Sequence, residues 1–286
     1  MASLAPDSEE VRRIDAALSE WRQGDLALDE SWFIHAGDPS LPLSEAAALA
    51  EEKGIQALTS EVEGLVVVTQ TCDIVRSCTN RPYVEVVPLV RVSDKERLII
   101  QRGHRPAYAT LPAMQERHLV ADFDRVMTVE KSIVAGWVRT PGCTSDVDSR
   151  MFALALARKR ARFAFPDDFT ALVRKLHSRL VDKHDKRTDE GRALRALREI
   201  RVQATPAWDA QAVSIFLWFI RSSKQVDFEG KNWADLLKYW LALVPTSGRY
   251  SVVEGQVVAL EDMTAAEHVD SDPLDLDYLS SLETDD

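Results

Sequence analysis

The stretch Gly64–Asp73 reads GLVVVTQTCD, and the interpretation of the first half of the chain starts from it. Its Leu and Val residues form a continuous run of strand length, and polar residues follow at once. An unbroken apolar run of this length is typical of a strand that is buried on both faces. We therefore predict a core strand over Gly64–Thr69 that ends where the polar residues begin.

Further strand-like segments surround this run. The turn residues 80–82 (NRP) separate it from a second apolar run at Tyr83–Val92. A helix that Ser44 caps and Gly54 ends is expected over Leu43–Lys53. Strands spaced by about ten residues favour a small barrel. The remaining strands are expected at Gly24–Leu28, Arg97–Gln101, Ala107–Leu111, His118–Phe123 and Val126–Val129.

Helical periodicity replaces this pattern beyond Asp146. Helices are expected on both sides of Pro166 and at Trp233–Leu243, and Arg249–Leu260 is expected to form a hairpin that turns at 254–255. The sequence thus predicts an α+β protein, with an N-terminal SH3-like small β-barrel that holds an inserted helix and then a helix-rich α/β module. We divide it into a lead-in helix (1–22), a barrel domain (23–145), a helical α+β domain (146–262) and an acidic tail (263–286).

The charge of the chain is strongly uneven. The net charge is −11 over 286 residues, which argues against a protein whose whole surface coats nucleic acid. Between Met151 and Arg201, however, 14 Lys and Arg stand against 7 Asp and Glu, whereas 251–286 contains no Lys or Arg. We therefore expect an acidic partner to bind only the basic region, and the chain's own acidic tail is one candidate for that partner.

The compartment is inferred from what the sequence lacks. No apolar run approaches the roughly 18 residues of a membrane span, and Met1–Arg13 has no apolar leader segment. The three cysteines, Cys72, Cys78 and Cys143, cannot all pair within one chain. A reduced cytoplasm, without membrane contact, is the expected location.

Several ordered segments resemble the PemK/MazF-like small barrel over residues 20–135. Residues 21–26 (WRQGDL) resemble its Gly-Asp first strand, and 65–69 (LVVVT) occupy the place of its core strand. Residues 84–89 (VEVVPL) match the strand that ends in a Pro, and 118–122 with 125–129 match the last strand pair. The resemblance implies a barrel of a toxin–antitoxin or anti-phage defence system of prokaryotes.

Members of that family are typically metal-independent endoribonucleases, which use an Arg before the core strand and a Ser or Thr after the Pro-containing strand. This chain has Glu63-Gly64 at the first place and Val90 at the second. Without that guanidinium, the charge that develops on phosphorus loses preorganised stabilisation worth several kcal/mol. Arg91 is the candidate that could replace it, together with Ser93, so an endoribonuclease is kept only as an alternative.

The polar residues after the core strand suggest a second alternative, a cysteine-dependent enzyme. Cys72 would be the nucleophile, with Asp73, His104 or His118 as its activating partner. The interpretation that we prefer is that Cys72 is a small buried residue and that Asp73 accepts backbone N–H groups in a turn. Whether the chain is an enzyme is left open, with Cys72, Asp73 and Arg91 as its catalytic candidates.

Two basic segments are candidate contacts for nucleic acid or for a partner protein. One is the predicted loop with Arg102, His104 and Arg105. The other is 158–165 (RKRARFAF), which combines the cations Arg158, Lys159, Arg160 and Arg162 with two aromatics able to stack on bases. Each segment could instead be a solvated surface.

Motifs for common cofactors are missing from the sequence: no phosphate-cradling Gly-rich loop, no dinucleotide fingerprint and no zinc motif occur. We therefore expect no cofactor and no metal. The leading hypothesis is a binding or interaction subunit on a toxin-like barrel, with a protein partner in a multi-component system and nucleic acid as the alternative partner.

Overall fold

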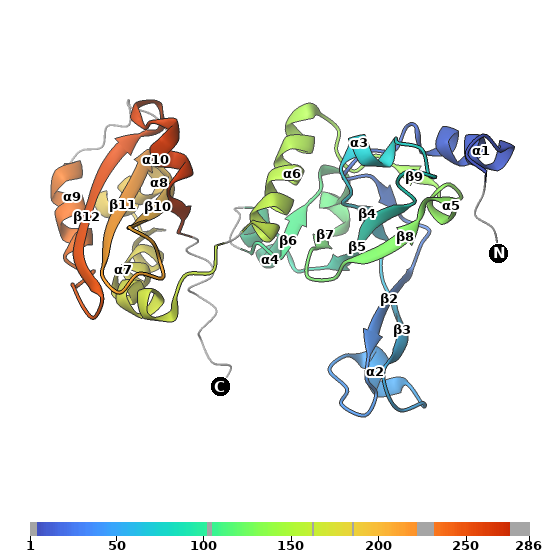
Figure 1. The fold of residues 1–286 in the computed structure, drawn as a ribbon, viewed down its shortest axis with the longest axis horizontal. Coiled ribbons are helices and arrows are strands. Elements are labelled where there is room, and N and C mark those ends of the chain that lie inside the picture. The colour runs from blue at the N-terminus through green and yellow to red at the C-terminus, as the bar shows by residue number, and fades with distance from the viewer. Residues whose placement is uncertain (1–4, 102–104, 162, 185, 222–231, 275–286) are drawn as a thin grey trace. The chain divides into compact units, whose positions relative to one another are not determined.

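The structure is a computed structural model that describes residues 5–101, 105–161, 163–184, 186–221 and 232–274. Contacts divide the chain into two compact units, Met1–Ala161 and Arg162–Asp286 (Figure 1). Both units combine helices with antiparallel strand pairs, which confirms the predicted α+β class. Within the described ranges, none of the helices has the length and apolar character that crossing a lipid bilayer requires.

The first unit is built on a seven-stranded antiparallel sheet in the order β6-β7-β5-β4-β1-β9, with β8 also paired to β5. The predicted core strand is β4, which lies between β1 and β5 and is at most 1% exposed. Its unbroken apolar run therefore reflects burial on both faces. The elements of this unit are α1 (Glu9–Leu18), β1 (Leu26–Ala27), β2 (Trp32–Gly37), α2 (Glu45–Leu49), β3 (Gln56–Glu61), β4 (Leu65–Val67), α3 (Thr71–Ile74), β5 (Tyr83–Arg91), α4 (Asp94–Gln101), β6 (Tyr108–Thr110), η1 (Pro112–Arg117), β7 (Leu119–Asp122), β8 (Met127–Glu130), α5 (Lys131–Val134), β9 (Arg139–Thr140) and α6 (Asp146–Arg160).

The strand pairing does not establish that the sheet closes into a barrel, so the SH3-like barrel stays a prediction. Among the described residues, the outer strands of the sheet path, β6 and β9, pair only with β7 and β1. The strand predicted at Arg97–Gln101 is wrong, because this segment lies in α4. Ser93 and Glu96 exchange hydrogen bonds between side chain and backbone, a reciprocal cap that begins a helix.

A separate hairpin projects from this sheet and carries α2 at its far end (Figure 1). Its strands β2 and β3 pair from Trp32↔Glu61 to Gly37↔Gln56, and neither was predicted from the sequence. The helix predicted at Leu43–Lys53 is present in shorter form as α2, and its predicted cap Ser44 accepts a hydrogen bond from the backbone N–H of Ala47. We call residues 32–61 the arm.

The helix α6 belongs to the first unit, whereas the sequence analysis placed it in the second domain. Its residues Phe152 and Leu156 are buried in a cluster with Val68 and Leu111 of the first unit. Because these apolar side chains complete the core beside the sheet, the division between the units falls after α6 instead of before it.

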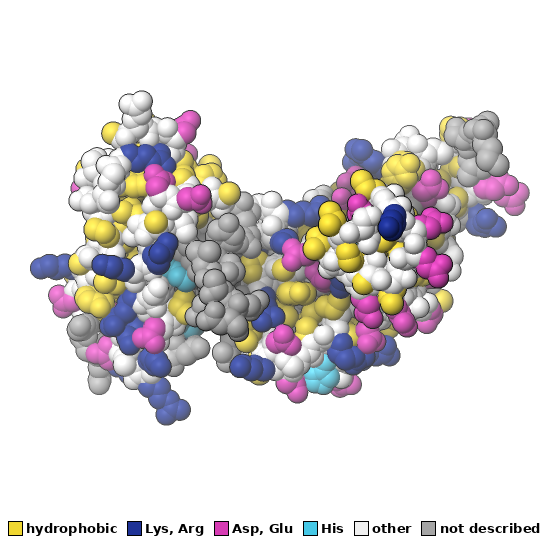
Figure 2. Space-filling view, turned by 90° about the horizontal axis from the view of Figure 1, so that it is seen from below, with side chains coloured by type: hydrophobic (Ala, Val, Ile, Leu, Met, Phe, Trp, Pro, Cys, Tyr) yellow, Lys and Arg dark blue, Asp and Glu magenta, His cyan; other side chains and the backbone are white. Residues whose placement is uncertain are grey.

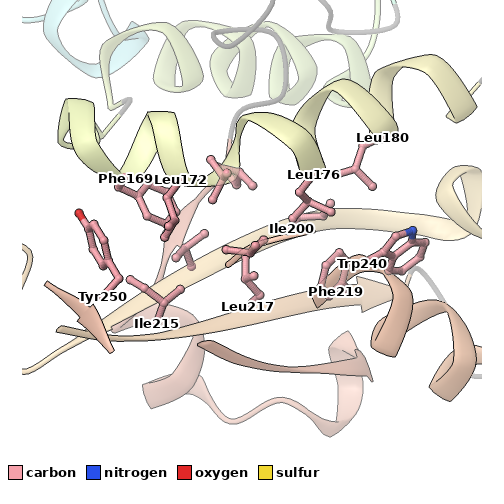
Figure 3. Packing of buried hydrophobic residues seen from close by; sticks show 14 of the residues in the cluster. Phe169, Leu172, Leu176, Leu180, Ile200, Ile215, Leu217, Phe219, Trp240 and Tyr250 are labelled. Carbon is pink, nitrogen blue, oxygen red and sulfur yellow. The ribbon is translucent and has the colours of Figure 1, made fainter. Parts of the chain in front are cut away.

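The second unit packs helices against a four-stranded sheet in the order β12-β11-β10-β13. In Figure 3, Leu172 and Leu176 point from the helix α7 toward the sheet, and the ring of Trp240 stacks on Phe219 with 4.8 Å between centroids. The elements are α7 (Asp167–His184), α8 (Asp189–Ala196), β10 (Leu197–Thr205), β11 (Val213–Arg221), α9 (Trp233–Leu241), β12 (Tyr250–Ala259), η2 (Leu260–Asp262), α10 (Ala265–Val269) and β13 (Asp272–Pro273).

Two expectations for this unit are corrected. Residues 250–259 form one strand, β12, parallel to β11, and not a hairpin. Gly255 is needed there for close approach, since a Cβ on it would lie 2.6 Å from the carbonyl oxygen of Leu217. The first part of the predicted acidic tail is folded: β13 pairs with β10, and Leu274 is buried. Its remainder, 275–286, lies outside the described residues.

Candidate functional site

A pocket of about 710 Å³ lies in the first unit, where the ends of β4 and β5 meet α3 and α6. Its apolar side chains include Val68 and Leu156, and most of the others carry hydrogen-bonding or charged groups. Such a mixture of apolar surface and convergent polar groups is typical of ligand sites. The polar side chains are the amides of Gln23, Gln70 and Asn80, the hydroxyls of Thr69, Thr128 and Tyr83, the guanidinium groups of Arg81 and Arg160, and the carboxylates of Asp73 and Glu85.

The polar residues that follow β4 act first as local scaffolding. The backbone N–H of Glu85 donates to Thr69 Oγ1 at 2.6 Å, and Gln23 donates from Nε2 to the carbonyl oxygen of Val68 at 2.8 Å. Thr71 Oγ1 accepts a further hydrogen bond from the backbone N–H of Gln23 at 3.1 Å. Side chains thus take over strand hydrogen bonds at this point, which explains why the apolar run stops here.

A buried lysine holds the short helix α3 in place. Lys131 is 1% exposed, and its Nζ donates to the carbonyl oxygens of Asp73 at 2.8 Å and Arg76 at 2.6 Å. Burial lowers the pKa of the Lys131 ammonium group, and the charge of Asp15 partly opposes this. Because these two carbonyl groups belong to the segment that carries Asp73, Lys131 positions one wall of the pocket.

Charged side chains at the pocket are paired but remain accessible. Arg76 Nε and Arg81 Nε each lie 3.9 Å from the same atom, Asp73 Oδ1, and both arginine side chains are more than half exposed. Across the pocket lining, Arg160 Nη2 lies 2.6 Å from Glu85 Oε2. Since two guanidinium groups share one carboxylate, the surroundings of Asp73 carry a surplus positive charge.

The cysteine hypothesis finds little support in this geometry. Cys72 is exposed in the first turn of α3, so the interpretation of it as a small buried residue is wrong, and its Sγ lies 3.7 Å from Gln70 Oε1. Asp73 faces the two arginines, and His118 faces a different residue, with Nδ1 3.2 Å from Asp94 Oδ1. His104 lies outside the described residues. A role for Cys72 as a nucleophile therefore stays a prediction.

Arg91 is held by the residue that stands where the family resemblance expects an arginine. Its Nε and Nη2 lie 3.0 and 2.9 Å from Glu63 Oε1, and its Nη1 donates to the carbonyl oxygen of Arg117 at 3.0 Å. Arg91 is not among the residues that line the pocket. The structure therefore gives Arg91 a local ion pair and does not bring it to Cys72 or Asp73.

The predicted loop 102–105 is only partly within the described residues. Arg105 lies there, with Nη1 3.3 Å from Glu96 Oε1, and its side chain is exposed. Arg102 and His104 lie outside the described residues, so their proposed phosphate contact stays a prediction.

The basic segment 158–165 is divided between the two units. Arg158 is exposed on α6, Lys159 pairs with Asp124, and Arg160 pairs with Glu85. The aromatic residues Phe163 and Phe165 instead belong to the second unit, where both pack against Trp208. Their rings serve packing inside that unit, which weakens the prediction of one stacking and phosphate-binding segment. Arg162 lies outside the described residues.

The pocket joins residues that the sequence analysis treated as separate sites, because Asp73 and Arg160 both line it. Sequence reasoning missed Arg81, Glu85 and Lys131. Arg81 was interpreted only as part of a turn, and its position two residues before a predicted strand could have marked it as a residue at a sheet end. A lysine between polar residues, by contrast, gives no local sign of burial.

Neither metal-ligand geometry nor similarity to known proteins assigns a further role to these residues. Over the described part of the chain, no group of three or more His, Cys, Asp and Glu side chains could hold a metal ion. Comparisons with protein-family models, with curated proteins and with solved structures find no match. The resemblance to PemK/MazF barrels therefore rests on the quoted residues alone.

Proposed function

We propose that this chain is a binding and interaction subunit, and that the pocket of the first unit takes up a phosphate-bearing ligand without reacting with it. The ligand class that best suits the lining is a nucleotide unit of single-stranded nucleic acid. The toxin–antitoxin or anti-phage defence setting that the resemblance implies, in a prokaryotic cytoplasm, belongs to the same proposal.

The observation that carries this proposal is the pair of arginines on one carboxylate. Arg76 and Arg81 both lie 3.9 Å from Asp73 Oδ1, beyond ordinary hydrogen-bond distance, so neither guanidinium fork is fully used there. An incoming phosphate offers a better-matched acceptor for Arg81, which lines the pocket. Exchange of an exposed ion pair for a phosphate contact has a small cost.

Other lining groups suit the remainder of a nucleotide. Tyr83 is 56% exposed at the pocket, which leaves its ring able to stack on a base. The amides of Gln70 and Asn80 offer donors and acceptors of the kind that read the edges of unstacked bases.

The test is binding of labelled single-stranded RNA and DNA, measured by fluorescence anisotropy at about 50 mM salt and again at higher salt. We expect binding that weakens with salt, and a loss of about 10-fold in Arg81→Ala, because one phosphate contact and its released counterion disappear. Arg12→Ala is the control, since Arg12 is exposed on α1 and outside the pocket. Competition by free nucleotides distinguishes a nucleotide site from a nucleic-acid site. If the unchanged protein fails to bind at low salt, or if Arg81→Ala binds equally well, the proposed ligand is wrong.

A further inference from the structure

The arm carries large apolar side chains that the fold leaves uncovered. Four of them are at least three-quarters exposed: Leu41 (76%), Leu43 (101%), Leu49 (75%) and Ile55 (85%). Among the described residues, Val269 is the one other large apolar side chain with an exposure in this range. Concentrated exposure of this kind on a folded protein marks interaction surfaces.

The four residues belong to one place, the tip of the arm. The ladder between β2 and β3 reaches the pair Gly37↔Gln56, so residues 38–55 form the connection that bears α2. The inner side of the tip is already packed: Ala47 and Leu58 are buried, and a Cβ on Gly37 would lie 2.4 Å from Leu58 Cδ1. The four exposed apolar side chains therefore do not form part of the packed interior of the arm.

Acidic side chains accompany this apolar tip. The arm has five Asp and Glu against the single Lys53, and Glu45, Glu51 and Glu52 are exposed in or beside α2. Figure 2, which views the molecule from the side toward which the arm projects in Figure 1, shows hydrophobic and acidic side chains gathered on this face of the first unit. A complementary surface must supply both apolar contact and positive charge.

We propose that the tip of the arm docks a partner protein that offers an apolar groove flanked by Lys or Arg side chains. Two tips of the same chain would bring like charges together, and anionic lipid surfaces would repel the same acids. This inference names the partner chemistry of the proposed interaction subunit and rests on that role, but it does not depend on the ligand of the pocket.

The test is photo-cross-linking of the full chain in cells of its native host. A photoreactive amino acid replaces Leu43 or Leu49 in the tip and, as a control, Val138, which is exposed in the first unit outside the arm. We expect both tip positions, and not Val138, to cross-link to one protein, at a region that combines apolar residues with Lys or Arg. Cross-linking to a second copy of the chain or to lipid, the same product from Val138, or no product from the tip overturns the proposal.

Binding to that purified protein then tests the two parts of the surface. Leu43→Glu should weaken affinity for the partner protein by about 10-fold or more. The variant removes an apolar side chain that packs into the partner's groove, and it places a negative charge there instead. The matched control is Leu154→Glu on α6, where the replaced leucine is 62% exposed. Reversal of charge in Glu51→Lys with Glu52→Lys should weaken affinity less, and mainly at low salt.

Equal affinity in Leu43→Glu and Leu154→Glu overturns docking through the tip. Because Leu43 is fully exposed, its replacement should leave the melting temperature unchanged, which separates lost binding from misfolding. Arg81→Ala should leave the cross-link intact, so failure of the pocket ligand and failure of the arm give different results.

Discussion

The two units contain arginine–glutamate pairs of nearly equal length in different surroundings. In the second unit Arg179 Nη2 lies 2.7 Å from Glu190 Oε2, and in the first unit Arg160 Nη2 lies 2.6 Å from Glu85 Oε2. The Glu190 side chain is 10% exposed and also accepts a hydrogen bond from Trp240 Nε1 at 3.1 Å, whereas the Glu85 side chain is 42% exposed. The two pairs thus have similar distances but different degrees of burial, and we infer different roles for them.

Burial decides which of these pairs belongs to the fold. A buried carboxylate that loses its partner is left without water, so its pair is needed for stability. An exposed carboxylate is hydrated when its partner moves, so its pair can be exchanged for a ligand at little cost. On this reasoning the Arg179–Glu190 pair belongs to the fold of the second unit, and the exposed pairs around the pocket of the first unit are available for binding.

The largest expected effect is on Glu190. Glu190→Gln should lower the free energy of unfolding of the second unit by about 3 kcal/mol, because the hydrogen bonds from Arg179 and Trp240 lose their charged acceptor. Glu85→Gln, the matched replacement in the first unit, should cost less than about 1 kcal/mol. Urea denaturation followed by tryptophan fluorescence measures both. Equal losses would contradict the assignment of one pair to folding and the other to binding.

The next effect concerns Lys131, the exception among the charges near the pocket because it is buried. Lys131→Met should cost about 1–3 kcal/mol of unfolding free energy, since the carbonyl groups of Asp73 and Arg76 lose their donor. It should also weaken nucleic-acid binding, because the pocket wall formed by α3 is no longer held in place. Lys95→Met, an exposed position on α4, is the control for both measurements. Unchanged binding in a destabilised Lys131→Met protein would show that Lys131 supports the fold alone.

The smallest effect is on the pH dependence of the second unit. Hydrogen bonds from Arg249 hold the pKa of Asp168 well below its ordinary value of 3.8, with further help from the Tyr250 hydroxyl. A carboxyl group with a lowered folded-state pKa contributes stability that is present above 3.8 and is lost as the pH falls below it. Because the Asp168 side chain is half exposed, we expect a contribution of about 1 kcal/mol.

Asp168→Asn should remove this contribution at neutral pH and flatten the decline of stability between about pH 4 and pH 2. Thermal unfolding across this range measures it, with Asp209→Asn, an exposed carboxylate of the same unit, as the control. A decline as steep as in the unchanged protein would assign the acid sensitivity to other carboxyl groups.

Secondary structure was predicted correctly where a segment carried a strong local pattern of apolar residues. Residues 64–69 and 83–92 were interpreted correctly as strands, because burial on both faces leaves long apolar runs. The strands of the arm were missed, since β2 and β3 alternate buried and accessible residues only weakly. The helix α4 was taken for a strand because its few apolar residues fit both periods, although Ser93 and Glu96 carried a capping signal.

The candidate site was foreseen in parts. Asp73 was singled out because polar residues follow a core strand abruptly, and Arg160 because it stands in a basic cluster. Their meeting in one pocket was not foreseen, since α3 and α6 lie more than seventy residues apart in the chain. Arg81 and Glu85 acquire their importance only from this meeting.

Local pattern was thus enough to establish the α+β class, the core strand β4 and the helix α9, because each buries a continuous stripe or face of its own residues. The three-dimensional arrangement was needed to place α6 in the first unit, to turn an expected hairpin into the parallel strand β12, and to assemble the pocket. These features depend on contacts between distant segments. Such contacts are selected by shape, burial and charge in the folded chain, and they leave no periodic signal in either segment.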